Sequence, residues 1–236
     1  MNGNYLIYLY AIPAILISLG FHEFAHAFVS YKLGDPTAKQ LGRLTLNPIK
    51  HLDPLGTLML LISMSSGFGF GWAKPVPINP SHYKNHKSGT VLVSLAGPVS
   101  NLILAFLFSF PMAYLVMKNG SVPNQIFDSS IRIYGSDFSL QTIIFYICRS
   151  FYMINIGLAV FNILPVPPLD GSKILTAILP ANQYFQLMRY ENYIGMAFLA
   201  IMLLVPGILS AILWPFRWAV QSAFMLIVPP LLNIFT

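Results

Sequence analysis

The residues best suited to chemistry form an HExxH pentapeptide, His22-Glu23-Phe24-Ala25-His26, near the start of the chain. Side chains four residues apart share one face of a helix, so His22 and His26 can hold a zinc ion between them. Glu23 is then placed to act as general base toward a water held by the metal. The pentapeptide therefore predicts zinc-dependent hydrolysis, for which this motif is typical in metalloproteases.

A catalytic zinc ion needs a further protein ligand beyond two histidines. The strongest candidate is Asp170, which follows a proline-rich break in a long apolar run. Irregular backbone at membrane depth is tolerated where it is buried in protein or lines a polar cavity, and a carboxylate there is costly unless it is paired or binds metal. Asp170 could instead cap a helix that begins near Ser172. We expect Asp170 to be the third ligand of one zinc ion per chain.

The pentapeptide lies within a stretch that should cross a membrane, because Leu6–Leu19 just before it holds no charged residue. Of the 236 residues, 56% are hydrophobic and 8% are charged, and the mean hydropathy is +0.68. These values exclude a soluble globular chain and predict a polytopic membrane protein. Met1–Tyr10 contains no Lys or Arg, so the first apolar run is expected to be a retained span and not a cleaved signal peptide.

Hydropathy predicts five long helices, over 5–32, 89–117, 139–165, 190–205 and 208–235. A membrane span takes about 20 residues, so the length leaves room for one helical bundle and for no appended soluble domain. We expect an all-α polytopic membrane protein with a single domain over 1–236. It would comprise a three-helix catalytic core within about 5–175, a re-entrant or β-hairpin segment, and two accessory C-terminal helices within about 190–235.

The region between the first two predicted helices is basic, with Lys32, Lys39, Arg43, Lys50, Lys74, Lys84 and Lys87. The positive-inside rule places this region in the cytoplasm and the N-terminus outside. Asp170 must return to the same membrane face as His26, and this return needs an odd number of crossings between the two sites. The helix over 89–117 supplies such a number only if the apolar stretch Leu55–Met64 enters the membrane without crossing it. The formal charge of +6 is scattered between apolar runs, which favours contact with anionic lipid over nucleic acid.

The segment Gly67–Pro77 alternates glycine with aromatic residues up to Trp72. This pattern is typical of an extended strand or hairpin at the membrane interface, with Trp72 at the level of the lipid headgroups. An exposed strand edge near the zinc could bind an unwound substrate by β-augmentation. The alternative is a plain interfacial anchor.

The sequence resembles the site-2 protease family of intramembrane zinc metalloproteases in four successive motifs over roughly residues 20–175. These motifs are Phe21–His26, Asn47–Gly56, Ala96–Asn101 and the segment from Phe161 to Gly171. The resemblance implies a three-helix core with HExxH on the first helix and the Asp-Gly ligand at the end of the third. It implies the compact branch without PDZ or CBS domains, with His22, His26 and Asp170 as zinc ligands and Glu23 as catalytic base.

The resemblance also implies the reaction, hydrolysis of peptide bonds in transmembrane segments of membrane-protein substrates, as in regulated intramembrane proteolysis. We expect a multi-pass protein of a bacterial plasma membrane with its active site toward the cytoplasmic side. The alternative is a non-proteolytic metal-binding membrane protein or a transporter, because intramembrane His and Asp can line an ion path. Glu23 favours the protease, since a transporter needs no carboxylate between two ligands. The oligomeric state does not follow from the sequence.

Asn162 lies about two helical turns before Asp170, within the third predicted helix. We expect it to stabilise the oxyanion or bind substrate, and an interhelical hydrogen bond is the alternative. Asn101 and the Gly97-Pro98 pair are expected to serve helix packing.

The remaining histidines and the cysteine are assigned structural roles. The resemblance suggests that His51 is a neighbour of the active site, and the alternative, which we favour over metal binding, is that it caps or braces its loop. His82 and His86 are interpreted as part of a solvated loop with no carboxylate nearby. The single cysteine, Cys148, is expected to be a packing residue.

Overall fold

The chain is helical almost throughout in the computed structural model, which describes residues 4–65, 71–118 and 139–235. Within these residues there is no strand, and one isolated antiparallel bridge joins Leu52 to Ala73. The α-helices are α1 (Asn4–Lys32), α2 (Thr37–Gln40), α3 (Pro54–Ser65), α4 (His86–Lys118), α5 (Leu140–Ile163), α6 (Gly171–Ile178), α7 (Ala181–Arg189), α8 (Glu191–Leu204) and α9 (Pro206–Phe235). Two short 3-10 helices are η1 (Pro48–His51) and η2 (Pro80–His82). The predicted all-α class is confirmed.

Helices of the described residues that are long and apolar enough to span a membrane are Tyr10–Lys32 of α1, His86–Lys118, Leu140–Ile163 and Ala211–Asn233 of α9. The three predicted core helices therefore correspond to α1, α4 and α5. Helix α3 has 12 residues, a length of about 18 Å at 1.5 Å per residue. That length falls short of the roughly 30 Å hydrocarbon layer, as expected for the stretch after Pro54. Helix α8, with 14 residues, is also shorter than a span.

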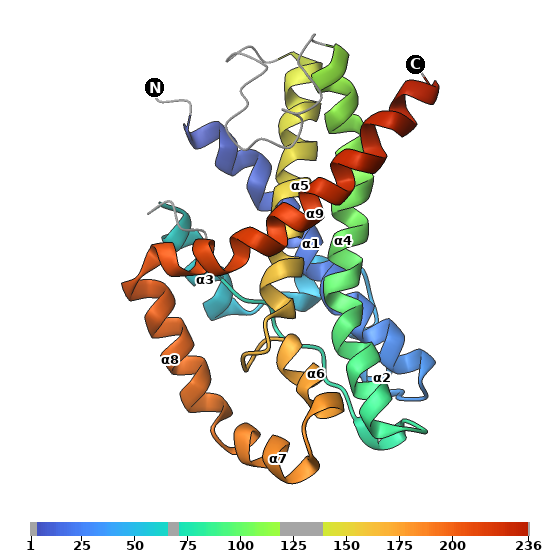
Figure 1. The fold of residues 1–236 in the computed structure, drawn as a ribbon, viewed down its shortest axis with the longest axis vertical. Helices are drawn as coiled ribbons and strands as arrows, with labels where there is room; N and C mark the ends of the chain where they lie inside the picture. The colour runs from blue at the N-terminus through green and yellow to red at the C-terminus, as the bar shows by residue number, and fades with distance from the viewer. Residues whose placement is uncertain (1–3, 66–70, 119–138, 236) are drawn as a thin grey trace.

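Helices α1, α4 and α5 lie side by side and form the centre of the bundle (Figure 1). Helices α4 and α5 share a core in which the small side chains of Ala105 and Ala113 are completely buried. The rings of Phe108 and Phe151 stack at 4.0 Å. Because lipid tails are as apolar as leucine, this packing rests on van der Waals contact more than on the exclusion of water. Helix α9 crosses α4 and α5 obliquely and covers one face of the pair (Figure 1).

The turn from α5 to α6 brings Asp170 back beside the end of α5. Helix α5 ends at Ile163, just before a segment in which Pro165, Pro167 and Pro168 lack a backbone N–H, and the peptide bond between Pro167 and Pro168 is cis. Gly171 then opens α6 directly against α5, where a Cβ would lie 2.5 Å from the carbonyl carbon of Ile163. Glycine is thus required for the close approach that positions its neighbour Asp170.

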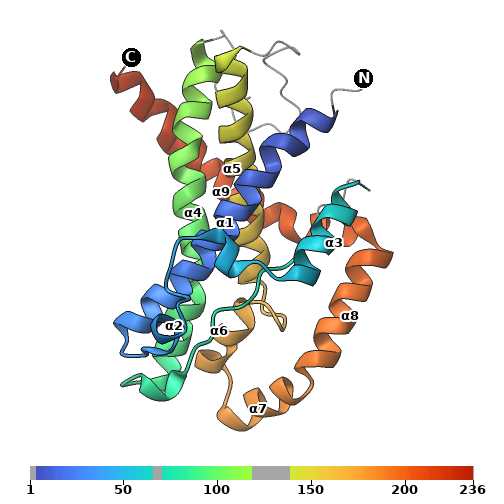
Figure 2. The same cartoon turned by 180° about the vertical axis from the view of Figure 1, so that it is seen from behind.

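The connections at the lower end of the bundle carry the polar and basic residues. Helix α2, the start of α4, and helices α6 and α7 lie at this end, whereas the two chain ends lie at the opposite end (Figures 1 and 2). Helix α8 leads back up along the side of the bundle to α9 (Figure 2). Helices α6 and α7 were not predicted from hydropathy because both are short and carry polar residues among their apolar ones.

Residues 71–79, which we call the strap, lie between α3 and η2 and have no regular secondary structure apart from the bridge at Ala73. The Lys74 backbone N–H donates a 2.8 Å hydrogen bond to the carbonyl oxygen of His51. Nη2 of Arg43 donates a 2.7 Å hydrogen bond to the Lys74 carbonyl oxygen. The hairpin predicted over this region can be followed only from Gly71, because residues 66–70 lie outside the described part, and what is described forms a single bridge.

Asp35 fastens the strap to the lower end of α1. Its carboxylate is completely buried and accepts hydrogen bonds from Ser30 Oγ at 2.8 Å, the Thr37 N–H at 3.0 Å and the Asn79 N–H at 2.8 Å. Tyr83 Oη lies 2.8 Å from Ser30 Oγ and extends the cluster. Burial on its own would raise the pKa of Asp35, but the hydrogen bonds from Asn79, Thr37 and Ser30 outweigh it and hold that pKa below its usual value.

Candidate metal site

Three side chains from two distant parts of the chain converge at the lower middle of the bundle. His22 and His26 lie one turn apart on α1, and Asp170 stands immediately before α6. Asp170 Oδ2 is 3.0 Å from Nε2 of His22 and 3.1 Å from Nε2 of His26, and the two Nε2 atoms are 3.0 Å apart. Both histidines are buried, with 4% and 6% of their surfaces exposed. In the described part of the chain, these residues form the group of His, Cys, Asp or Glu that could hold a metal ion.

Asp170 occupies the N-cap position of α6 but makes no side-chain capping hydrogen bond. Its Oδ2 faces the two histidines, and its Oδ1 lies 3.9 Å from Nζ of Lys173. The capping role that the sequence left open is therefore not the one the carboxylate adopts. Its position matches that of a third metal ligand.

The hydrogen-bond partners of the two rings define which nitrogens face the centre. His26 Nδ1 lies 2.7 Å from the carbonyl oxygen of Val93, and His22 Nδ1 lies 2.6 Å from Oδ1 of Asn101. Carbonyl oxygens only accept, so both Nδ1 atoms carry the hydrogen and both Nε2 atoms present a lone pair.

This donor set fits a zinc ion. Two imidazole lone pairs and a carboxylate oxygen lie 3.0 to 3.1 Å apart, and no hydrogen stands between them to offset their mutual repulsion. A cation relieves that repulsion. Two ligands each 2.0 to 2.1 Å from a tetrahedral zinc ion are about 3.3 Å apart, close to the separations seen here, and nitrogen and oxygen are ligands that zinc prefers.

Gly97 of α4 leaves room beside the three ligands. A Cβ at this position would lie 2.6 Å from Nε2 of His22 and closer still to Nε2 of His26. Any larger residue would therefore fill the space that a metal ion and its solvent ligand need. The Gly97-Pro98 pair was expected to serve helix packing, and the structure gives Gly97 a direct contact with the site.

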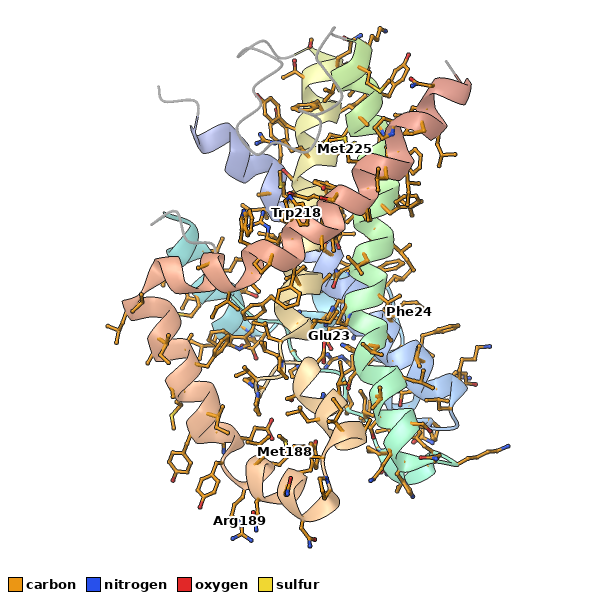
Figure 3. The ribbon with its side chains drawn as sticks, viewed as in Figure 1. Glu23, Phe24, Met188, Arg189, Trp218 and Met225 are labelled. Atoms are coloured by element: carbon orange, nitrogen blue, oxygen red, sulfur yellow. The ribbon has the colours of Figure 1, made fainter. Side chains whose placement is uncertain are left out.

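Glu23 lies next to His22 on α1 and is half-buried. Figure 3 shows it at the level of the lower middle of the bundle, well above Arg189 of α7. Its Oε2 accepts a 2.9 Å hydrogen bond from the backbone N–H of Val76 in the strap. Glu23 is not one of the three converging groups, so its carboxylate is available as a base beside them.

The structure gives Asn162 a different hydrogen bond from either one expected. Its Nδ2 donates to the carbonyl oxygen of Leu158 at 3.0 Å, within α5. The interhelical bond that was the alternative is not the contact observed, and the oxyanion role stays a prediction.

The other histidines lie in the polar connections. His51 is buried, and its Nε2 lies 2.8 Å from the Thr45 carbonyl oxygen, so it braces the loop before α3. His86 Nδ1 lies 2.7 Å from the Pro80 carbonyl oxygen. The expectation that no carboxylate lies near His82 is wrong, because its Nδ1 is 3.6 Å from Oδ1 of Asp35. Asp35 is 47 positions away in sequence, so only the folded strap reveals the pair.

Sequence reasoning missed a buried polar network behind His22. Asn101, assigned to packing, contacts the His22 ring, and Asn155 and Ser18 complete the network. All three of these polar side chains are completely buried. The available signal was polar residues inside apolar helices, which are costly in a membrane unless paired.

An all-α bundle with helices able to span a membrane, and with two histidines and an aspartate converging inside it, defines an integral membrane protein with a buried candidate metal site. The chain belongs to Peptidase family M50, the site-2 protease family, whose sequence profile matches residues 10–205. The resemblance found in the sequence is thereby confirmed. No PDZ or CBS domain is identified in the chain.

Known relatives carry names that agree with this family. Two are named "Putative zinc metalloprotease": YwhC of Bacillus subtilis is 40% identical over 227 residues, covering 94% of each chain, and Rip2 of Mycolicibacterium smegmatis is 26% identical over 223 residues, covering 93% of this chain and 77% of the relative. Zinc metalloprotease MJ0392 of Methanocaldococcus jannaschii is 24% identical over 197 residues, covering 83% of this chain and 42% of the relative. No solved structure gives a significant match.

Proposed function

We propose that the protein is an intramembrane zinc metalloprotease that hydrolyses peptide bonds in transmembrane segments of other membrane proteins. The observation that carries the proposal is the convergence of His22 Nε2, His26 Nε2 and Asp170 Oδ2 at 3.0 to 3.1 Å within a bundle of apolar helices. One zinc ion per chain would be held by these three groups. The M50 membership and the names of the relatives support the same assignment.

Each residue of the site would have a separate role in hydrolysis. When bound, zinc supplies Lewis acidity, which lowers the pKa of a water and polarises the scissile carbonyl. Glu23 takes a proton from the attacking water at a carboxylate oxygen and returns it to the amide nitrogen that leaves. The Val76 N–H holds Oε2 of Glu23 in a fixed position, so the base does not have to be ordered during the reaction. Asn162 would donate a hydrogen bond to the developing oxyanion after releasing Leu158.

The charge distribution supports a site that opens toward the cytoplasm of a bacterial plasma membrane. Basic residues are concentrated in the connections at the lower end of the bundle, where α2 and α7 lie (Figures 1 and 3). The positive-inside rule makes this end cytoplasmic. The substrate would be a single transmembrane segment whose helix unwinds near this end. The strap beside Glu23 would receive the unwound segment by β-augmentation through its carbonyl oxygens, because the Lys74 and Val76 N–H groups already donate to His51 and Glu23. This use of the strap would extend its role beyond that of an interfacial anchor.

The test combines zinc content with cleavage. Purified protein in detergent should hold about one zinc per chain by elemental mass spectrometry, and His26→Ala and Asp170→Asn should lose most of it. Glu23→Gln should retain the zinc but cleave a panel of fluorescent single-span peptides in liposomes about 100- to 10,000-fold more slowly. Full zinc in Asp170→Asn would overturn the ligand assignment. Zinc binding without any Glu23-dependent cleavage would favour the non-proteolytic metal-binding protein or transporter.

A further inference from the structure

A relay of hydrogen bonds between buried side chains links His22 to the backbone of α5. Oδ1 of Asn101 on α4 lies 2.6 Å from His22 Nδ1, and Nδ2 of Asn101 donates to Oδ1 of Asn155 on α5 at 2.7 Å. Nδ2 of Asn155 in turn donates to Oγ of Ser18 at 2.7 Å and to the carbonyl oxygen of Phe151 at 2.8 Å. This relay therefore connects all three core helices.

The Phe151 carbonyl oxygen, at the end of the relay away from His22, determines the direction of every hydrogen bond in it. The Phe151 carbonyl oxygen can only accept, so the amide group of Asn155 that faces it must be the NH₂. The oxygen of Asn155 must then face Asn101. It can only accept, so the NH₂ group of Asn101 must be the donor to it. That leaves the oxygen of Asn101 toward His22, so Nδ1 of His22 must carry the hydrogen.

The backbone of α1 supports the same orientation. Nδ2 of Asn101 also lies 3.4 Å from the carbonyl oxygen of Ser18, another group that only accepts. Turning the Asn101 amide over would place its oxygen against two acceptors, Asn155 Oδ1 and Ser18 O. Because all three side chains are completely buried, the reversed arrangement would leave acceptors facing one another unpaired and is strongly disfavoured.

We infer that Asn155, acting through Asn101, is a positioning residue that holds His22 in the tautomer able to bind a metal ion at Nε2. The inference rests on the metal site proposed above. His26 needs no such relay, because its Nδ1–H meets the Val93 backbone carbonyl directly. Groups that orient metal-bound histidines in this way contribute roughly 10- to 100-fold to metal affinity.

Asn155→Leu removes the relay while keeping a side chain of similar size. Zinc affinity, measured by competition with a chelating dye on detergent-purified protein, should fall roughly 10- to 100-fold. Asn155→Asp should stay within about threefold of wild type, because burial favours its neutral acid, whose carbonyl can accept from Asn101 while its hydroxyl donates to Phe151 O. Ser18→Ala should also stay close to wild type, since the Phe151 carbonyl still orients Asn155.

The tautomer itself gives a readout that a purely structural role would not change. Nitrogen-15 NMR of histidine-labelled, zinc-free protein should show His22 protonated at Nδ1 in wild type and Asn155→Asp, with the signal assigned by its loss in His22→Ala. Asn155→Leu should show a mixture of tautomers. Ser109→Ala is the control for a lost buried hydroxyl on α4, since Ser109 bonds only within its own helix in the contacts described, and it should leave both readouts unchanged.

The outcomes separate this inference from the proposed function. Wild type that binds no zinc overturns the metal site, whatever Asn155 does. Wild-type zinc affinity and an unchanged His22 tautomer in Asn155→Leu overturn the inference alone. If Asn155→Leu does not fold, Asn155→Ser removes the same amide with less bulk, and it must show the same loss of affinity for the inference to stand.

Discussion

Glu23 and Val76 lie 53 positions apart in sequence and are joined by a hydrogen bond of 2.9 Å from the Val76 backbone N–H to Oε2 of Glu23. The proposed base is thus held by the strap and not by a neighbour on its own helix. The strap is itself fixed on both sides of Val76, by the hydrogen bond from Lys74 to His51 and by the hydrogen bond from Asn79 to Asp35. Movement of the strap would therefore change the position of the carboxylate.

Replacing Val76 by proline removes the N–H that holds Glu23. We expect peptide cleavage to fall about 100-fold, because a base displaced by about 1 Å loses this much rate. Zinc content should not change, since no metal ligand contacts Val76 in the described hydrogen bonds. The control is Val76→Ala, which keeps the N–H and should retain most activity. Equal cleavage rates in the proline and alanine variants would show that this hydrogen bond does not position the base.

Adding one methyl group at Gly97 should strongly weaken metal binding. The new Cβ would lie 2.6 Å from Nε2 of His22, so Gly97→Ala must displace the rings that face the metal. We expect zinc content to fall by about tenfold or more. Gly157→Ala on α5 is the matched control, because a Cβ there meets nothing within 4 Å. Zinc retained in Gly97→Ala would mean that the ligands converge elsewhere.

The sequence predicted those parts of the site that local chemistry determines. Histidines four residues apart on an apolar helix, and a carboxylate after a proline-rich break, required little tertiary information, and the structure places them together. The roles of Gly97 and Asn155 could not be predicted, because each depends on which atoms of another helix lie opposite. The pairing of Glu23 with the strap was missed because the donor is a backbone group, whose position the residue type does not reveal.

The helix bounds also divide into those that local sequence predicts and those that depend on the tertiary structure. Long apolar runs gave the bounds of α1, α4 and α5 to within a few residues, because a span must be continuous and apolar. The short helices α6 and α7 follow from how the chain returns beneath the bundle, and hydropathy over a span-length window does not detect them.

Asn162 offers a test of the predicted oxyanion role. If its Nδ2 exchanges the Leu158 carbonyl for the oxyanion of the substrate, Asn162→Ala should lower kcat by about 100- to 1000-fold with little change in KM. Zinc content should be unchanged, because Asn162 does not contact the three converging groups in the described hydrogen bonds. A normal kcat in Asn162→Ala would contradict the oxyanion role of Asn162.

Excess zinc should stabilise the wild-type protein and not a variant that lacks a ligand. A ligand present at 100 times its Kd stabilises the folded state by about 2.7 kcal/mol, and a metal ion would also relieve the repulsion among the three acceptors at the site. We therefore expect chelation to lower the melting temperature of wild type by several degrees, and zinc to restore it. His26→Ala should melt at the same temperature with and without zinc. An equal response of both proteins would indicate zinc binding at some other place.

Asp35 should control the stability of the strap in a pH-dependent manner. Its pKa in the folded protein lies below the usual value, with burial opposing and the hydrogen bonds from Asn79, Thr37 and Ser30 dominating. A lowered folded-state pKa means that the ionised carboxylate contributes stability fully above its unfolded-state pKa of about 3.9, and that this contribution is lost as the pH falls through the folded value.

Asp35→Asn should therefore lower the melting temperature by several degrees at pH 7, since a hydrogen bond to a charged group is worth about 1.5 to 3 kcal/mol. The difference from wild type should persist down to about pH 5 and shrink below about pH 4. Asp53→Asn is the control, because Asp53 Oδ1 accepts from the Gly56 N–H at the start of α3 and asparagine caps a helix equally well. A difference between wild type and Asp35→Asn that grows below about pH 4 would contradict the assigned ionised state of Asp35, because a carboxylate that takes up a proton loses the charge on which these hydrogen bonds depend.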